Sequence, residues 1–232
     1  MFQQLYKVLI DSAKWLMDWS FGLTGNYGIA IILFTVLIQI ITYPLKHPQM
    51  RYSKINMIMA PKLKEIQTKY KGDQQKITDE TLALWKKYKV NPAAGCIPSL
   101  ITLPVFFAIL AVMRQIQFPA GPASSFIWIP NIGAVDQLRI LPVLSGLSTY
   151  FQLQIGGAAN EPSQKSMLYM FPLMMVWITW SAPAGLALYW ATSNVLAIIQ
   201  QYLANRLIKI PELQEETVAE VKKGAAVKNE KP

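Results

Sequence analysis

The stretch GIAIILFTVLIQIITYPL, residues 28–45, decides the fold, because it is a long apolar segment without a single charged side chain. Its 18 residues, at a rise of about 1.5 Å each, form a helix of about 27 Å, close to the ~30 Å hydrocarbon core of a bilayer. Thr35, Gln39 and Thr42 are four and three residues apart and share one face of this helix. We therefore predict a transmembrane helix whose polar face meets water or other polar groups.

The composition of the whole chain agrees with a membrane protein. Of its 232 residues, 53% are hydrophobic and 15% are charged, and the mean hydropathy is +0.27. The formal net charge of +9 is typical of cytoplasmic loops beside anionic lipid, and we do not expect binding to DNA. The single cysteine, Cys96, and the single histidine, His47, do not suffice for a disulfide or a metal site. We expect no catalytic residues, no metal and no cofactor.

The remaining segments complete an all-α prediction with three parts. Residues 1–24 place apolar side chains near helical spacing but interrupt them with charges, which predicts an amphipathic helix at the extracytoplasmic interface. Residues 25–207 form a core of five transmembrane helices, with the first at 28–45 and the others at about 96–116, 140–155, 167–182 and 186–203. The charged tail, residues 208–232, is expected to be disordered.

A strongly basic insertion separates the first two predicted spans. Residues 46–90 contain 11 Lys and Arg against four acids. The turn sequence at 71–73, flanked by amphipathic segments, predicts an antiparallel helical hairpin, with Pro61 kinking or interrupting its first helix. One interpretation is an ordinary solvated loop. The other is a docking arm for ribosomal RNA or anionic lipid, with contacts through Lys62, Lys64, Lys69 and Lys71.

The distribution of positive charge predicts the orientation. With the hairpin in the cytoplasm, five spans place the N-terminus outside and the C-terminus inside, and 18 of the 22 Lys and Arg residues then lie inside. No charged residue falls in the middle of a predicted span, which argues against a proton-coupled transporter.

Several predicted spans carry uncharged polar groups. Beside those of the first span, they are Thr102, Ser145, Ser148, Gln152, Tyr189, Trp190, Ser193 and Asn194. Such groups need partners, because burying them unpaired costs a few kcal/mol. Interhelical hydrogen bonds are the favoured interpretation for the serines and threonines. For Gln39 and Gln152, a hydrated cavity and a hydrogen bond between helices are equally acceptable.

Two long motifs, NPAAGCIPSLITLPVFFAI (91–109) and GLALYWATSNVLAIIQQ (185–201), resemble the YidC/oxidase-assembly family of membrane protein insertases. The resemblance covers residues 20–207, including TYPL (42–45) and the basic hairpin. It implies a hydrophilic groove that is open to the cytoplasm and to lipid but closed on the far side. This groove receives the polar tail of a nascent membrane protein, in a monomer that contacts the ribosome, the Sec translocon and anionic lipids.

The chain departs from the family at one groove position. Members usually carry Arg four residues after a threonine and four before a Tyr-Pro pair, whereas here Gln39 stands between Thr35 and Tyr43. By the same resemblance, the second polar groove residue is Thr102 and the aromatic one is Trp190. The resemblance thus implies a wet groove without its fixed cation.

These observations together predict an insertase and chaperone of the bacterial inner membrane, acting alone or with the Sec translocon. The alternative from another class is a channel or solute carrier that uses the polar helix faces as a permeation path. A structural assembly factor that holds other spans without inserting them is a third possibility. The uncharged spans and the closed far side implied by the resemblance argue against the channel.

Overall fold

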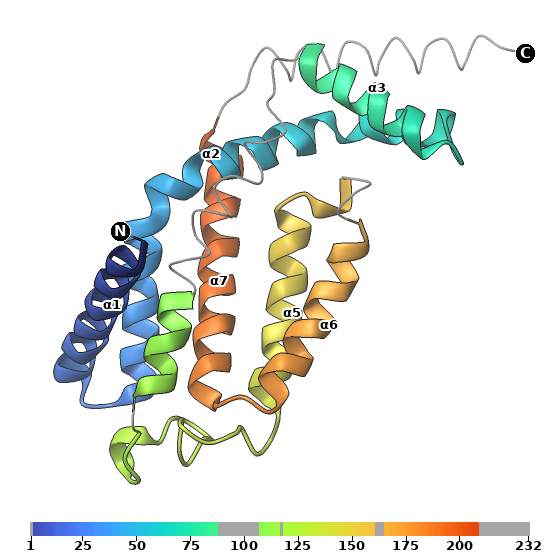
Figure 1. Ribbon diagram of the computed structural model, residues 1–232. Helices are drawn as coiled ribbons and strands as arrows, with labels where there is room; N and C mark the ends of the chain where they lie inside the picture. The colour runs from blue at the N-terminus through green and yellow to red at the C-terminus, as the bar shows by residue number, and fades with distance from the viewer. Residues whose placement is uncertain (1, 88–106, 117, 161–164, 209–232) are drawn as a thin grey trace, which may run out of the picture.

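The structure, a computed structural model, describes residues 2–87, 107–116, 118–160 and 165–208. Within these ranges the regular elements are helices, and extended pairing is limited to two isolated bridges. The helices are α1 (Phe2–Thr24), α2 (Tyr27–Lys69), α3 (Gln74–Lys87), α5 (Ile140–Ile155), α6 (Lys165–Trp180) and α7 (Ala184–Leu207), with 3-10 turns η1 (Pro122–Ser124) and η2 (Ala158–Asn160) and a helical segment at 107–115 (Figure 1). The all-helical prediction is confirmed.

Helix α2 continues well past the predicted first span. It has 43 residues, about 65 Å in length, and contains Pro44, Pro48 and Pro61 in its interior. The Asn26 side chain accepts hydrogen bonds from the backbone N–H groups of Gly28 and Ile29 and so begins the helix. Figure 1 shows α2 changing direction between its apolar and basic halves, as expected where proline removes helical hydrogen bonds. The helix is not interrupted at Pro61. A proline removes one backbone N–H donor, which bends a helix without ending it where the flanking turns are held by packing.

Helix α3 folds back against the basic half of α2. The chain turns at Gly72, which has a φ of +96°, a conformation that glycine adopts readily. A small apolar cluster then joins the two helices, formed by Ile55, Met59 and Leu63 with Ile58, Leu84, Trp85 and Ile208. The described part of this region, two helices joined by a turn, ends at residue 87, and the last residues of the predicted hairpin lie outside it.

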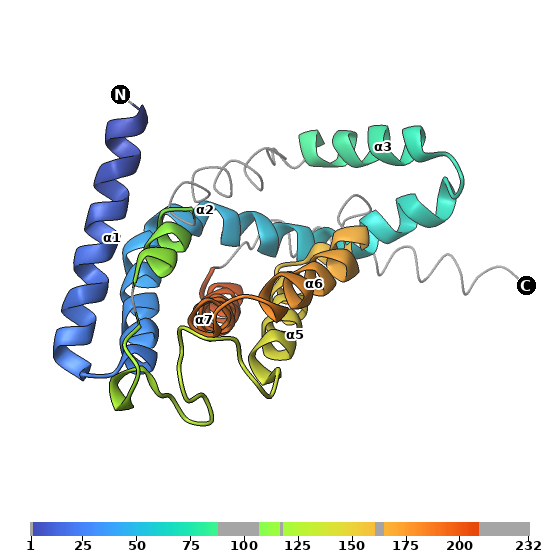
Figure 2. The same cartoon turned by 60° about the horizontal axis from the view of Figure 1, so that its bottom comes forward.

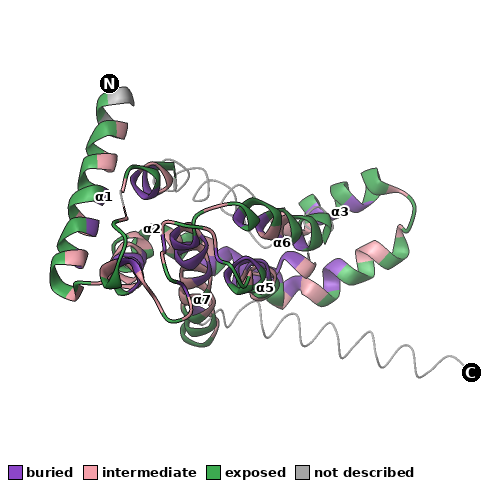
Figure 3. Ribbon diagram, turned by 90° about the horizontal axis from the view of Figure 1, so that it is seen from below, coloured by how far each residue is buried: buried purple, intermediate pink, exposed green. Residues whose placement is uncertain are grey.

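The helices of the bundle follow the spatial order α2, α7, α5, α6, with α1 against α2. A common core joins α1, α2, the 107–115 segment and α7, and includes Met17, Phe34 and Ile109. In contrast, large apolar residues of α6 such as Trp177 (78% exposed) point outward. Seen from below, α1 and the outer side of α6 are mostly exposed and α7 is largely covered (Figure 3). An exposed apolar surface of this kind suits contact with lipid.

Residues 118–139 fold across one end of the bundle (Figure 2). The carbonyl groups of Ile132 and Ala134 accept hydrogen bonds from the first N–H groups of α7, at 2.8 and 2.7 Å. Asp136, only 2% exposed, accepts from the backbone N–H of Leu141 at 2.8 Å and thereby supports the start of α5. This end of the bundle is therefore closed by chain whose backbone groups are hydrogen-bonded to the helices.

Three helices have bounds near those of predicted spans, whereas the predicted span at 96–116 lies largely outside the described residues. Helix α5 matches the predicted 140–155, while α6 and α7 begin two residues before the predicted starts. In the described part of the chain, α2 alone is both long and apolar enough to cross a membrane by itself. Helices α5 and α6 have 16 residues each, about 24 Å, which is short for a span.

Candidate polar cavity between α2, α5 and α7

Gln39 links α2 to α7. Its side chain is 4% exposed, and its Nε2 donates hydrogen bonds to the carbonyl oxygen and the hydroxyl of Ser193, at 3.0 and 2.8 Å. The Tyr189 hydroxyl also hydrogen-bonds Ser193. The remaining acceptor of Gln39, Oε1, receives a hydrogen bond from Lys46, two helical turns further along α2. The amide of Gln39 is thus fully paired at the meeting point of two helices.

The other polar residues of the same α2 face do not reach a second helix. The hydroxyls of Thr35 and Thr42 donate to carbonyl groups four residues earlier in α2, at 2.6 and 2.7 Å. Thr42 lines a different, largely apolar hollow of about 610 Å³ between α1, α2 and the 107–115 segment. The predicted face is therefore divided, and only Gln39 bonds to another helix.

The polar face of α5 pairs with α7. The Thr149 hydroxyl accepts from Trp190 Nε1 at 2.9 Å and lies 2.8 Å from the amide of Asn194, which also contacts Ser148 at 3.1 Å. The buried Ser145 donates to the carbonyl of Ala187 at 3.2 Å. These contacts are the interhelical hydrogen bonds favoured for the serines. Thr149, four residues after Ser145, lies on the same polar face of the sequence pattern and is the centre of these contacts.

A polar cavity of about 200 Å³ lies at the end of the bundle opposite residues 118–139. It is bounded by residues 46–56 of α2, 152–156 of α5 and the adjoining chain, and 197–201 of α7. Its polar lining consists of Lys46, Gln49, Tyr52, Ser53, Asn56, Gln152, Gln200 and Gln201. Gln152 is the one member of the predicted groove set that lines it. The members from α2 were missed because the change in composition after residue 45 suggested that the first span ended there, and Gln200 and Gln201 lie at the far end of the last predicted span.

Two buried amide oxygens at this cavity have no hydrogen-bond partner within the described chain. They are Oδ1 of Asn56, a residue 3% exposed, and Oε1 of Gln200. Buried acceptors are normally paired, so an unpaired one requires an explanation. At the same cavity, Lys46 brings an ammonium group to Gln39, and burial lowers the pKa of Lys46 to about 8. A cation thus lies beside Gln39, although the residue at that position is itself neutral.

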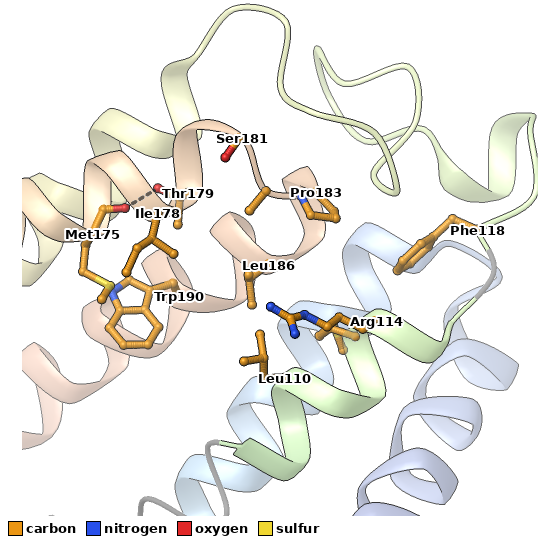
Figure 4. A pocket seen from close by; sticks show the side chains of 12 residues that line it. Leu110, Arg114, Phe118, Met175, Ile178, Thr179, Ser181, Pro183, Leu186 and Trp190 are labelled. Carbon is orange, nitrogen blue, oxygen red and sulfur yellow. Dashed lines mark hydrogen bonds between the residues drawn. The ribbon is translucent and has the colours of Figure 1, made fainter.

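A second hollow, of about 450 Å³, lies between the 107–115 segment, α6 and α7. Figure 4 shows Arg114 directed toward Leu186, with Leu110 and Trp190 nearby. Its lining is mostly apolar, and it adjoins the closed end through Phe118 and Pro183. Trp190 therefore separates this hollow from the hydrogen bonds between α5 and α7.

The hairpin lysines do not form a uniform set. Lys64, Lys69 and Lys71 are exposed, whereas Lys62 is 8% exposed. Its burial does not suit the surface contact proposed for it from the sequence. Thr102 lies outside the described residues. In the described part of the chain, no group of His, Cys, Asp and Glu is arranged to hold a metal ion.

The fold defines an all-helical membrane protein with one closed end and a polar cavity at the other. The family model for the 60Kd inner membrane protein matches residues 19–212, and the chain belongs to this family.

Relatives with curated names share most of this chain. One from Fusobacterium nucleatum subsp. nucleatum is 38% identical over 85% of this chain and 95% of its own length. One from Geobacter sulfurreducens is 36% identical over 91% of this chain but only 39% of its own length. Both are named membrane protein insertase YidC. A crystal structure described as an active YidC insertase with its first transmembrane domain resolved has a TM-score of 0.65 and 28% identity, covering 85% of this chain and 46% of that one.

Proposed function

We propose that this chain is a membrane protein insertase and chaperone. It takes nascent or newly made membrane proteins into a polar groove and releases their apolar segments sideways into the bilayer. The likeness to proteins named membrane protein insertase supports this proposal. The observation that carries it is the contrast between the two ends of the bundle: one is closed by residues 118–139, and the other holds a polar cavity against three helices.

The proposed topology has five spans, with the N-terminus outside and the C-terminus in the cytoplasm. The closed end then faces outward, and the cavity and the hairpin face the cytoplasm, in agreement with the basic composition of residues 46–90. Helix α1, residues 2–24, lies at the outer interface in this arrangement. The 16-residue helices α5 and α6 leave the bilayer thin beside the groove.

The groove works by lowering the cost of carrying polar chain partway across the membrane. Unpaired backbone groups cost several kcal/mol each in hydrocarbon, and amide and hydroxyl side chains provide substitute partners. The apolar segment of the substrate then partitions into lipid along the exposed faces of the helices. Partition and the membrane potential drive the reaction, so no nucleotide is required.

The exposed lysines of the hairpin, Lys64, Lys69 and Lys71, are the proposed contacts with ribosomes and anionic lipid, and the Sec translocon is a further proposed partner. Co-sedimentation of the protein with ribosomes and with anionic vesicles measures the first two contacts. If replacing these three lysines by glutamate leaves binding at low salt unchanged, the hairpin is only a solvated loop.

The test of the proposed function is insertion of a small single-span protein into vesicles that contain the purified chain. We expect Gln39→Leu to reduce insertion, because it breaks the contacts with Ser193 and Lys46. Gln39→Arg should be tolerated, because a guanidinium is polar and can still donate hydrogen bonds to Ser193. Gln154→Leu, the same exchange at an exposed position of α5, is the matched control.

Two results would contradict the proposal. One is insertion by the wild-type chain at the rate of empty vesicles. The other is flux of ions or small solutes through the reconstituted chain, which the channel hypothesis requires. Equal insertion by wild type and a correctly folded Gln39→Leu would remove Gln39 from the mechanism.

A further inference from the structure

The hollow of about 450 Å³ between the 107–115 segment, α6 and α7 has an arginine at its wall and no acid to match it. Arg114 lies one turn after Leu110 and is directed into the hollow toward Leu186 (Figure 4). No Asp or Glu lines the hollow in the described chain. In that part of the chain Arg114 also forms no ion pair or hydrogen bond, so its guanidinium is available to an anion.

A second arginine near the same end of the bundle is already paired. The guanidinium of Arg139 lies over the ring of Trp180, 5.1 Å from its centroid, and donates a hydrogen bond to the carbonyl oxygen of Trp180. The chain thus supplies partners for Arg139 but none, among the described residues, for Arg114. The two arginines therefore provide a comparison between a structural cation and an unoccupied one.

The hollow becomes more apolar with distance from the closed end. Arg114 and the exposed Ser181 lie near the turn between α6 and α7. Met175 and Trp190 are each about four to six helical residues from that turn, which places them roughly 6–9 Å further along the bundle. A ligand that suits this gradient has an anionic head beside the closed end and an apolar body.

Exposed indole side chains mark the same level of the bundle. Trp177 and Trp180, near the end of α6, are 78% and 46% exposed. Tryptophan is enriched where hydrocarbon meets the headgroups of a membrane, because its ring is apolar and its N–H is polar. The anionic head of the ligand would therefore lie at the depth of the lipid headgroups.

A phospholipid has this form. Its phosphate accepts two parallel hydrogen bonds from a guanidinium, and an acyl chain covers apolar side chains. The volume of the hollow falls within the range of about 300–1,000 Å³ that is usual for small-molecule sites. A polypeptide suits the hollow less well, because its backbone N–H and C=O groups would lack partners along a mostly apolar wall. Inorganic phosphate would leave that wall uncovered.

We propose that this hollow binds one phospholipid from the leaflet at the closed end, with its phosphate on Arg114 and one acyl chain against Leu110, Leu186 and Trp190. The lipid fills the space between the 107–115 segment and α6. This proposal goes beyond the insertase function and does not depend on it. Only the naming of that leaflet as the outer one rests on the proposed topology.

The experiment measures lipid binding to the full chain in an uncharged detergent, by native mass spectrometry of the complex with one bound lipid. The two probes are phosphatidylglycerol and diacylglycerol with the same acyl chains, so that their difference reports the headgroup with its phosphate. The variants are Arg114→Gln, Arg114→Lys and Leu110→Trp, the last of which fills part of the hollow. Arg139→Asn is the matched control, because it removes a cation from the same end and asparagine tolerates the φ of 56° at that position.

We expect wild type to bind phosphatidylglycerol at least tenfold more tightly than diacylglycerol. Arg114→Gln should remove about tenfold of this affinity, the lower range for a hydrogen bond to a charged group, and leave diacylglycerol unaffected. Arg114→Lys should keep most of it, because an ammonium still pairs with phosphate. Leu110→Trp should weaken both lipids, and Arg139→Asn should weaken neither.

Equal affinity of wild type for the two lipids would overturn the proposal. So would an equal loss in Arg114→Gln and Arg139→Asn, which would indicate attraction by surface charge alone, or unchanged binding by a folded Leu110→Trp.

A measurement on wild type locates the lipid without any variant. Phosphatidylglycerol with a diazirine in the middle of one acyl chain is irradiated on the protein, and the labelled residues are mapped. The proposal requires label within residues 107–115 or 175–190, and label confined to other parts of the chain would overturn it. Because neither experiment involves insertion, a failure of the insertase function would leave their outcome unchanged.

Discussion

The two ends of the helix bundle differ in how a buried charged group is hydrogen-bonded. At the closed end, the carboxylate of Asp136 accepts hydrogen bonds from the indole of Trp128 and from the backbone N–H groups of Leu138 and Leu141. At the other end, the ammonium of Lys46 has a neutral partner, and two amide oxygens nearby have no hydrogen-bond partner among the described residues. The first arrangement is complete within the chain and fixes its structure. The second is incomplete within the described chain, as expected of a site that binds something else.

The largest effect is expected from breaking the complete end. Asp136→Ala leaves the Trp128 indole and two backbone N–H groups without their acceptor, and each stranded donor costs about 1–3 kcal/mol. We expect a loss of about 3 kcal/mol in the free energy of unfolding, measured by thermal denaturation in detergent. Gln137→Ala, at the exposed neighbouring position, is the control. An Asp136→Ala protein as stable as that control would show that the carboxylate does not hold this end together.

A smaller loss should follow from crowding the same end. A Cβ at Gly28 would overlap the side chain of Phe126, which packs there against the start of α2. Helix propensity alone predicts that Gly28→Ala stabilises the chain by about 1 kcal/mol. Overpacking typically costs about 1–3 kcal/mol, so we expect a net loss of about 1 kcal/mol in the same denaturation assay. Stabilisation by Gly28→Ala would mean that Phe126 and its surrounding segment shift readily to make room. The closed end would then be less rigid than we infer.

A third prediction concerns the charge of Lys46 itself. Because burial lowers its pKa from 10.5 to about 8, the folded chain binds fewer protons than the unfolded chain between these values. The cost of burying the ammonium is therefore present below about pH 8 and is relieved as the pH rises from about 8 toward 10.5. Tyr52 is the other titratable side chain that lines the cavity.

We expect the thermal stability of wild type to rise relative to Lys46→Gln over this range. A difference in stability between the two proteins that does not change from pH 7 to pH 10 would show that the ammonium is solvated and that the cavity end is not distinct in this respect.

Much of the helical framework is predictable from the sequence. The apolar segments at 140–155 and around 170 and 195 set the positions of α5, α6 and α7, because long apolar runs bounded by Pro and Gly leave few other options. The hydrogen-bond partners of the polar residues were harder to predict. Thr35 and Gln39 share a face, but a threonine hydroxyl can be satisfied by its own helix, whereas a longer glutamine amide reaches the next one.

The hydrogen bond between Lys46 and Gln39 could not be predicted from the composition of the sequence. The abrupt change from apolar to basic residues suggested that the membrane segment and the hairpin were separate elements. Helix α2 instead continues through Pro44 and Pro48, so that Lys46 stays in register with Gln39 and its flexible side chain extends back two turns. Lys62 is also buried, although a lysine in a basic segment is expected to be solvated.

The continuity of α2 also gives the molecule a mechanical connection. The basic half, residues 46–69, extends about 36 Å beyond the apolar half, and Pro44 and Pro48 lie where the two meet. A pivot of about 10° at these prolines would move the tip of the hairpin by about 6 Å, and Lys46, near the fulcrum, by far less. Conversely, a force applied to the tip by a bound particle acts on the fulcrum with the advantage of a long lever. Helix α2 is therefore suited to transmit an event at the hairpin to the wall of the cavity.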